Sequence, residues 1–191
     1  MDAALVLGLY HWATGQAWLA NLVVVVAQNG IFVLPIVVAV RGFQTLVDGD
    51  RLREAIIAGG AAAVLAFAIG LVLERTLHRP RPFLELGFPP LFPHADDSSF
   101  PSDHTLVGIA LVGPLLWRAS RTGSVLVAWG LVVGFARVCA GVHYPSDILG
   151  SAFLAVLLDG LAWYALPRRL LVRFRVLRSL RSDVRPPDNP P

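Results

Sequence analysis

Residues 3–40 contain no Asp, Glu, Lys or Arg, and this charge-free stretch constrains the fold more than any other feature of the chain. A helix that crosses a membrane needs about 20 mainly apolar residues, so the stretch is too long for one span. We therefore expect an interfacial helix at 3–14 and a first span at 17–40, separated near Gly15. The polar segment 28–30 interrupts this span and is expected to face the protein interior.

Four further apolar stretches predict the remaining spans, at 55–73, 104–117, 124–141 and 148–166. Only 15% of the residues are charged, whereas soluble proteins carry about 25%. The sequence therefore predicts an all-α fold, a polytopic transmembrane helical bundle of about five spans plus an N-terminal interfacial helix. Residues 1–181 are expected to form a single membrane-embedded domain, and the polar, Pro-rich residues 182–191 a disordered cytoplasmic tail. Small residues around Gly59 and Gly60 favour close helix packing.

All 16 basic residues are Arg, and their distribution predicts the orientation of the chain. One side of the bundle receives Arg41, Arg51, Arg53, Arg118, Arg121, Arg168, Arg169, Arg173, Arg175, Arg178, Arg181 and Arg185, and the other receives Arg75, Arg79, Arg81 and Arg137. Arginine-rich loops and tails stay in the cytoplasm, so the N-terminus is expected outside and the C-terminus inside. Because the arginines do not gather on one soluble basic face, nucleic-acid binding is not expected.

Three short polar clusters, at 79–82, 100–104 and 137–147, interrupt this apolar background at the outer ends of the predicted spans. Transfer of a phosphoryl group needs donors for its oxygens, a nucleophile in line and an acid for the leaving oxygen. The histidines, arginines and aspartates of the clusters can supply these roles. The sequence therefore predicts an enzyme that acts on a lipid phosphate.

His143 is the candidate nucleophile, with Asp147 four residues later. Pro145 fits the first turn of the last helix, because its missing N–H would have no helical partner there. Asp147 can then reach back to Nδ1–H and leave Nε2 free to attack. The same pair fits a structural role equally well, in which it ties a loop to a helix.

His104 is the candidate general acid, in the first turn of a helix that Ser102 would cap. Backbone N–H groups at a helix N-terminus bind phosphate oxygens, and the Ser102 hydroxyl could add a further donor. The alternative is an ordinary helix cap at the membrane surface.

Two arginines are the strongest candidates for phosphate binding. Arg137 lies within the apolar run 132–142, where an ionised side chain usually faces a polar cavity. Arg81 stands between two prolines that stiffen the segment, and arginine matches phosphate with a planar fork of donors. Arg79 also fits a position along the membrane interface, with its charge in the headgroup region.

A metal site is a further alternative, and the residues that would form it are His78 and His94 with Asp96, Asp97 or Asp103. Their spacing fits no established ligand pattern. Cys139 is the only cysteine, which excludes an intramolecular disulfide and a Cys-based metal site. We therefore expect no metal.

Together the clusters resemble the signature of the type 2 phosphatidic acid phosphatase superfamily, which is Lys-x6-Arg-Pro, Pro-Ser-Gly-His and Ser-Arg-x5-His-x3-Asp. The matching residues here are Arg81 and Pro82, then Pro101, Ser102, Asp103 and His104, then Ala136, Arg137, His143 and Asp147. The sequence is most similar to bacterial undecaprenyl pyrophosphate phosphatases of the bacitracin-resistance type, through residues 79–83, 93–96, 99–105, 134–137 and 141–150.

This resemblance implies His143 as nucleophile, Asp147 as its orienting partner and His104 as general acid. The phosphate-binding candidates are Arg81, Ser102, Arg137, Asp103, Arg75 and Arg79. Glu74 stands where the signature has Lys, so Arg75 or Arg79 is expected to supply that charge. Ala136 replaces the signature Ser, and Asp103 replaces Gly as expected in the narrower branch.

The implied reaction is hydrolysis of undecaprenyl pyrophosphate to undecaprenyl phosphate through a phosphohistidine, without a cofactor, at the outer face of the bacterial inner membrane. The product would return to peptidoglycan synthesis, and the partners are the polyprenyl diphosphate and membrane lipids. One alternative is the same chemistry on phosphatidylglycerophosphate or phosphatidic acid. An alternative of another class is a non-catalytic lipid transporter or binding protein. The sequence does not determine the oligomeric state.

Overall fold

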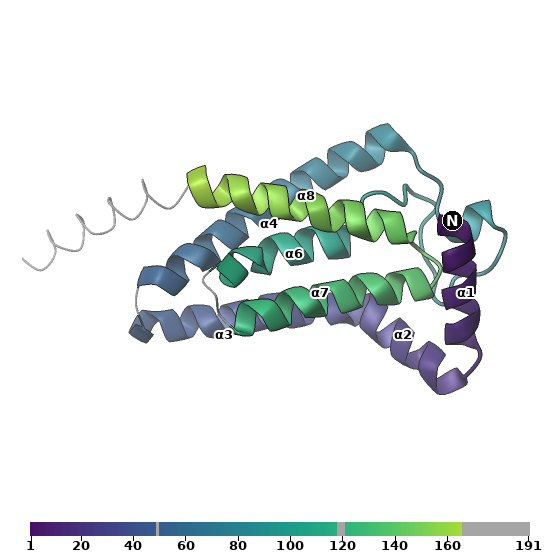
Figure 1. The fold of residues 1–191 in the computed structure, drawn as a ribbon, viewed down its shortest axis with the longest axis horizontal. Helices are drawn as coiled ribbons and strands as arrows, with labels where there is room; N and C mark the ends of the chain where they lie inside the picture. Colours follow the sequence, from purple (N-terminus) through teal and green to yellow (C-terminus); the bar gives the residue numbers. More distant parts are fainter. Residues whose placement is uncertain (49, 118–120, 166–191) are drawn as a thin grey trace, which may run out of the picture.

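A computed structural model describes residues 1–48, 50–117 and 121–165, and in this part of the chain helices joined by loops form the whole fold (Figure 1). The helices are α1 (Asp2–Thr14), α2 (Ala17–Asn29), a 3₁₀ turn (Gly30–Phe32), α3 (Val33–Asp48), α4 (Asp50–Leu77), α5 (Pro82–Glu85), α6 (Asp103–Trp117), α7 (Arg121–Cys139) and α8 (Pro145–Ala165). The predicted all-α fold is confirmed. The predicted tail at 182–191 lies outside the described residues.

Four helical stretches in the described residues are long and apolar enough to cross a membrane, and they are Ala17–Phe43, Leu52–Glu85, Arg121–Cys139 and Pro145–Ala165. Our expectation of about five spans also counted the helix that begins at His104. That helix, α6, has only 15 residues, and α4, α7 and α8 pack around it. Because neighbouring helices cover much of its surface, α6 need not be long enough to cross the membrane by itself.

The predicted interruption of the first span is a 3₁₀ turn between α2 and α3. Its Gly30 is buried, and the Gly30 carbonyl accepts a hydrogen bond from the indole N–H of Trp129 on α7 at 2.7 Å. The break therefore faces the protein, where a side chain can satisfy a backbone carbonyl that the helix no longer uses.

Helices α4 and α6 approach each other closely at Gly59. A Cβ atom at this position would lie 2.2 Å from the Leu111 carbonyl oxygen of α6, whereas a Cβ at Gly60 would meet no atom within 4 Å. The small-residue prediction is therefore correct for Gly59, and Gly60 makes no such contact.

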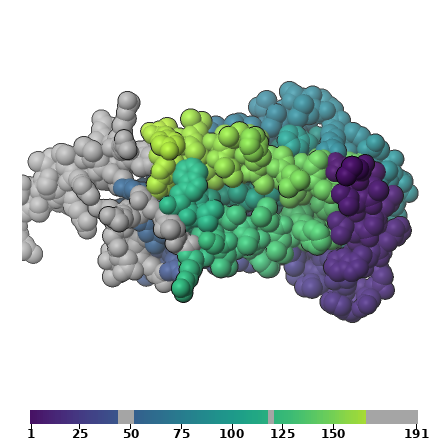
Figure 2. Space-filling view, in the orientation of Figure 1, coloured from purple at the N-terminus to yellow at the C-terminus, as the bar shows by residue number. Residues whose placement is uncertain are grey.

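The polar clusters meet at one end of the bundle, where α7 ends and α6 and α8 begin (Figure 1). Helix α1 lies across this end, and the space-filling view shows it beside the first part of α8 (Figure 2). At the opposite end, Arg41 of α3 donates to the hydroxyl of Thr122 on α7 at 2.8 Å. The orientation predicted from the arginine distribution stays a prediction.

We expect Gly59→Ala to destabilise the bundle, because backbone oxygen of α6 blocks the new methyl group. Overpacking of this kind costs about 1–3 kcal/mol. The matched control is Gly60→Ala on the same helix, which has open space. Thermal unfolding of the two purified variants in detergent should show a lower midpoint for Gly59→Ala alone, and equal midpoints would contradict the packing argument.

Candidate active site

The segment after α4 folds back over the polar end of the bundle. The backbone N–H of Ser99 donates to the Arg79 carbonyl at 2.8 Å, and the N–H of Leu91 donates to the Ala140 carbonyl at 3.1 Å. Pro82 opens the short helix α5 at its first turn, where a proline needs no hydrogen-bond acceptor. These contacts bring the arginines of the first cluster to the ends of α7 and α8.

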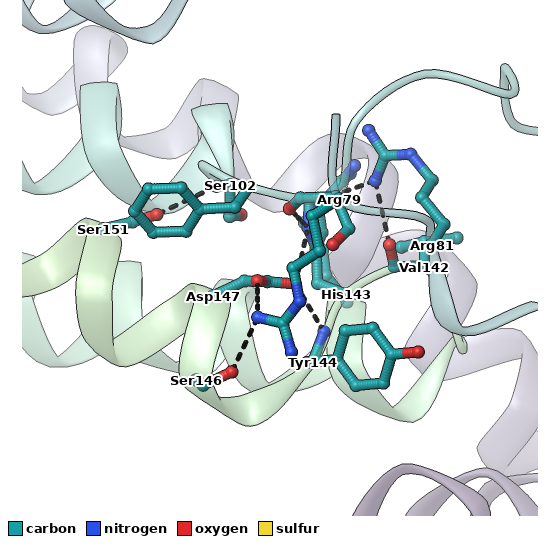
Figure 3. Close-up of polar contacts among 12 residues, drawn as sticks. Arg79, Arg81, Ser102, Val142, His143, Tyr144, Ser146, Asp147 and Ser151 are labelled. Carbon is teal, nitrogen blue, oxygen red and sulfur yellow. Dashed lines mark hydrogen bonds and ion pairs between the residues drawn. The ribbon is translucent and has the colours of Figure 1, made fainter. Parts of the chain in front are cut away.

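His143 lies in the loop between α7 and α8, and its side chain is only 1% exposed. Its Nδ1 lies 2.7 Å from the Ser99 carbonyl oxygen, which can only accept a hydrogen bond. Nδ1 is therefore the protonated nitrogen, and Nε2 carries the free electron pair. Nε2 lies 3.2 Å from a terminal nitrogen of Arg81, which donates to it (Figure 3).

The pKa of His143 lies well below the ordinary histidine value of 6.5, first because burial penalises the charged ring and then because Arg137 and Arg81 repel a further positive charge. The imidazole is therefore neutral near pH 7, which is the state in which Nε2 can attack an electrophile.

Asp147 lies in the first turn of α8, as the position of Pro145 predicts. Its Oδ2 accepts the backbone N–H of Tyr144 at 2.8 Å and lies 3.8 Å from Nδ1 of His143. The expected hydrogen bond from Nδ1 to Asp147 is thus made to the Ser99 carbonyl instead. Asp147 is already occupied by the Tyr144 N–H and by Arg79, so its negative charge stands next to the ring without a direct hydrogen bond.

Arg81 is held rigidly in the buried part of the site. Its Nε donates to Asp97 at 2.6 Å, and the terminal nitrogen that faces His143 also donates to the Val142 carbonyl at 2.8 Å. The side chain is only 6% exposed. The Asp97 carboxylate and the Val142 carbonyl fix the plane of the guanidinium beside His143.

Arg137 is 4% exposed and lies at the end of α7. One terminal nitrogen donates to the Ala27 carbonyl at 3.2 Å, and the other donates to Nε2 of His94 at 2.9 Å. Its Nε–H is buried without a hydrogen-bond partner. Within the described residues Arg137 forms no ion pair with a carboxylate, so this guanidinium retains both a positive charge and a free donor.

His94 joins the site, although the sequence suggested it only as a metal ligand. Its ring centroid lies 6.5 Å from that of His143, and its Nδ1 lies 3.2 Å from the Ala95 carbonyl oxygen. Burial and the positive charges of Arg81 and Arg137 lower its pKa, although nearby Asp97 opposes this effect. No spacing rule predicts His94, because it reaches the site through the fold of the 78–102 loop.

Ser102, Asp103 and His104 form the start of α6. The Ser102 carbonyl accepts the first helical hydrogen bonds, from the N–H groups of Thr105 and Leu106 at 3.0 and 2.8 Å. The buried Ser102 hydroxyl lies 3.2 Å from the Thr105 hydroxyl rather than capping a backbone N–H. His104 is hydrogen-bonded to the backbone of Gln28 at the break in the first span.

The remaining candidates lie in different surroundings. Arg79 bonds to Asp147 at 2.5 Å, so it belongs to the support of the site. Arg75 is exposed on α4 and has no hydrogen bond or ion pair with the described residues. An oxygen of Asp103 would lie 3.1 Å from a Cβ at Gly70, so this side chain packs against α4. Glu74, at the position of the signature Lys, lies near Asp97.

Among the described residues, no group of three or more His, Cys, Asp or Glu side chains is placed to hold a metal ion. The metal-site alternative for His78 and His94 therefore has no complete donor set in this part of the chain.

Comparison with known proteins defines the class. Residues 54–171 match the PAP2 superfamily, and the chain belongs to this superfamily. The chain is 37% identical over 113 residues to the undecaprenyl-diphosphatase BcrC of Bacillus subtilis (strain 168), a match that covers 59% of this chain and 58% of that protein. It is 29% identical over 163 residues to the putative undecaprenyl-diphosphatase YbjG of Escherichia coli (strain K12), covering 83% of this chain and 80% of that protein.

The fold is also similar to the first transmembrane PAP2 type phosphatidylglycerolphosphate phosphatase from Bacillus subtilis, with a TM-score of 0.61 and 23% identity. This similarity covers 84% of this chain and 82% of that structure. The family match gives the class, a PAP2 superfamily protein, and its apolar helices are long enough to cross a membrane. The match to BcrC spans less than two thirds of the length of that relative.

We expect nuclear magnetic resonance of histidine-labelled protein to show His143 as the neutral Nδ1–H tautomer near pH 7, with protonation only well below pH 6.5. The spectrum of His143→Gln assigns the signal. Because the unfolded chain binds this proton at a higher pH than the folded protein, acidification below pH 6.5 should also lower the free energy of unfolding. A His143 midpoint at or above the ordinary value would contradict the burial argument.

Proposed function

We propose that the protein hydrolyses undecaprenyl pyrophosphate to undecaprenyl phosphate and inorganic phosphate through a phosphohistidine at His143. The observation that carries this proposal is the neutral imidazole whose unprotonated Nε2 accepts a hydrogen bond from Arg81, with Arg137, which forms no ion pair with a carboxylate among the described residues, close by. A nucleophile next to two guanidinium groups is suited to a phosphorus atom with anionic oxygens.

In the first step, the Nε2 electron pair of His143 attacks the terminal phosphorus, and the bond from this phosphorus to the bridging oxygen breaks. The bridging oxygen leaves with that electron pair on the lipid monophosphate, and His104 supplies a proton to it. Arg81, Arg137 and Ser102 donate to the phosphoryl oxygens. Other contacts hold the two guanidinium groups in place before substrate binds, Arg81 at Asp97 and Arg137 at the Ala27 carbonyl.

During attack the His143 ring becomes a cation, because Nδ1 keeps its proton while Nε2 binds phosphorus. The Ser99 carbonyl accepts a hydrogen bond from this Nδ1–H, and the Asp147 carboxylate at 3.8 Å stabilises the charge. Water then attacks the phosphorus and gives a proton to His104, which restores the acid. The P–N bond breaks with its electron pair returning to Nε2, and the neutral imidazole and inorganic phosphate are released.

The choice of a polyprenyl diphosphate is supported by the names of the relatives BcrC and YbjG. The alternative, phosphatidylglycerophosphate, is supported by the name of the structural neighbour. We place the reaction at the outer face of the membrane, because the site lies at the opposite end of the bundle from Arg41 and Thr122. A non-catalytic lipid carrier would have no use for an oriented neutral histidine.

We expect His143→Ala to lose phosphate release by a factor on the order of 10³ or more, because the covalent intermediate can no longer form. The variant should still insert and unfold at a similar temperature. Brief incubation of wild-type protein with substrate labelled in its terminal phosphate should trap acid-labile, alkali-stable phosphate on His143. Near-normal turnover by the variant would refute the mechanism.

Purified protein should show the highest kcat/KM with undecaprenyl pyrophosphate when phosphatidylglycerophosphate and phosphatidic acid are compared in EDTA. A preference for either monophosphate ester would replace the proposed substrate while keeping the mechanism. Activity that disappears in EDTA and returns with a divalent cation would show instead that the reaction requires a metal.

A further inference from the structure

The first residue of α1 reaches the site from the far end of the sequence. A carboxylate oxygen of Asp2 accepts a hydrogen bond from Arg79 at 3.0 Å, and the other accepts the backbone N–H of Ser146 at 3.3 Å. The Ser146 hydroxyl also donates to Asp2. Residues 2 and 146 are 144 positions apart, so the fold and not local sequence creates this contact.

Arg79 thereby lies between two carboxylates. One terminal nitrogen donates to Asp147 at 2.5 Å and to Ser146 at 2.8 Å (Figure 3). The other donates to Asp2. The guanidinium carbon also lies 4.3 Å from the centroid of the Tyr144 ring. Exposed ion pairs contribute little when they stand alone, but here four partners fix one guanidinium in a single orientation.

The net charge of this network determines how much negative charge lies next to the His143 ring. Asp2 and Asp147 each contribute one negative charge and Arg79 one positive charge, so the network of these three residues carries a net charge of about −1 near pH 7. Without Asp2 the remaining pair would be neutral. The carboxylate next to the histidine would then be fully compensated by Arg79.

The negative charge that Asp2 adds matters because the other charged side chains near His143 are mainly arginines. Arg81 and His94 from the 78–102 loop and Arg137 from α7 act directly on the ring. Asp97 is next to Arg81 and His94, and Asp103 and His104 from α6 act on Arg137. The two arginines oppose a positive charge on the ring, and Asp97 is bonded to Arg81. Asp147 is thus the carboxylate adjacent to Nδ1, and its effective charge depends on what else binds Arg79.

We propose that Asp2 is a positioning residue of the phosphatase reaction, which holds Arg79 and keeps the Asp2–Arg79–Asp147 network negative behind the His143 ring. This inference rests on the proposed phosphohistidine mechanism, in which that ring becomes cationic. Helix α1 is then part of the active site, and its packing against the start of α8 has a chemical consequence.

The test is Asp2→Asn in full-length protein with any affinity tag at the C-terminus, so that the N-terminus is unchanged. We expect kcat to fall about tenfold, with KM within about twofold, because Asp2 stabilises the ring cation and does not touch substrate. Asp2→Glu should restore most of the activity. If Asp2→Asn does not fold, Asp2→Ser keeps an acceptor oxygen without the charge, and the same expectations apply.

The pH profile separates this role from a purely structural one. Loss of a negative charge lowers the pKa of His143 further, so the acid limb of kcat/KM should move to lower pH. A loosened loop that admits water would instead raise this pKa toward its ordinary value, and a shift in that direction would overturn the proposal.

Two controls complete the experiment. Asp96→Asn removes the same charge from an exposed position of the 78–102 loop and should leave kcat and the pH profile unchanged. In an Arg79→Gln background, Asp2→Asn should have little further effect, because the link to Asp147 is already gone. Wild-type kcat in Asp2→Asn, or an equal loss in Asp96→Asn, would refute the role of Asp2. Failure to trap phosphate on His143 in wild-type protein would refute the proposed function itself.

Discussion

The burial of two guanidinium groups, those of Arg81 and Arg137, beside one uncharged imidazole is the constraint on which the polar end of the bundle depends. Charges removed from water are costly unless their N–H groups find acceptors. Arg81 has Asp97 and the Val142 carbonyl as acceptors, and Arg137 has the Ala27 carbonyl and His94. The electrostatic cost is thus reduced enough for the fold to keep two positive charges where a phosphate can reach them.

Several of these acceptors are backbone carbonyls that a continuous helix would have used internally. Ala27 precedes the break between α2 and α3, and Ser99 and Val142 lie in loops. Irregular backbone at membrane depth is tolerated where protein covers it or where it lines a polar cavity. The broken first span and the long 78–102 loop are therefore requirements of the site, since they supply oxygens that hold Arg137 and His143 in place.

The helices and the main candidate catalytic residues could be predicted from the sequence, because both predictions rest on patterns of neighbouring residues. Apolar length predicts the spans, and Pro145 with the His143–Asp147 spacing predicts the first turn of α8. The Ser99 carbonyl could not be predicted, since every residue carries such an oxygen and only the fold selects one. The place of His94 was equally hidden, because its route to Arg137 runs through loop conformation.

The charge environment of Arg79 was also not predictable from the sequence. As a sequence feature it was a candidate for the charge of the missing signature Lys, but in the structure two carboxylates, Asp2 and Asp147, already bind it. The sequence gives the number of arginines near the site and does not show which of them a carboxylate neutralises. That division depends on contacts 68 and 77 positions apart.

The division of carboxylates among the arginines gives each arginine a different function. Asp97 contacts Arg81 at Nε, and one terminal nitrogen donates to the Val142 carbonyl and to His143. The N–H groups of the second terminal nitrogen are left for a phosphate, which need not displace the carboxylate. Arg79 is compensated twice and serves the nucleophile through Asp147. Arg137 forms no carboxylate ion pair among the described residues, and its buried Nε–H is unsatisfied, so an anion that entered would gain the most there. Because Glu74 stands where the signature has Lys, this chain lacks that positive charge, and we expect its phosphate affinity to depend more heavily on Arg137 than in a relative that keeps the Lys.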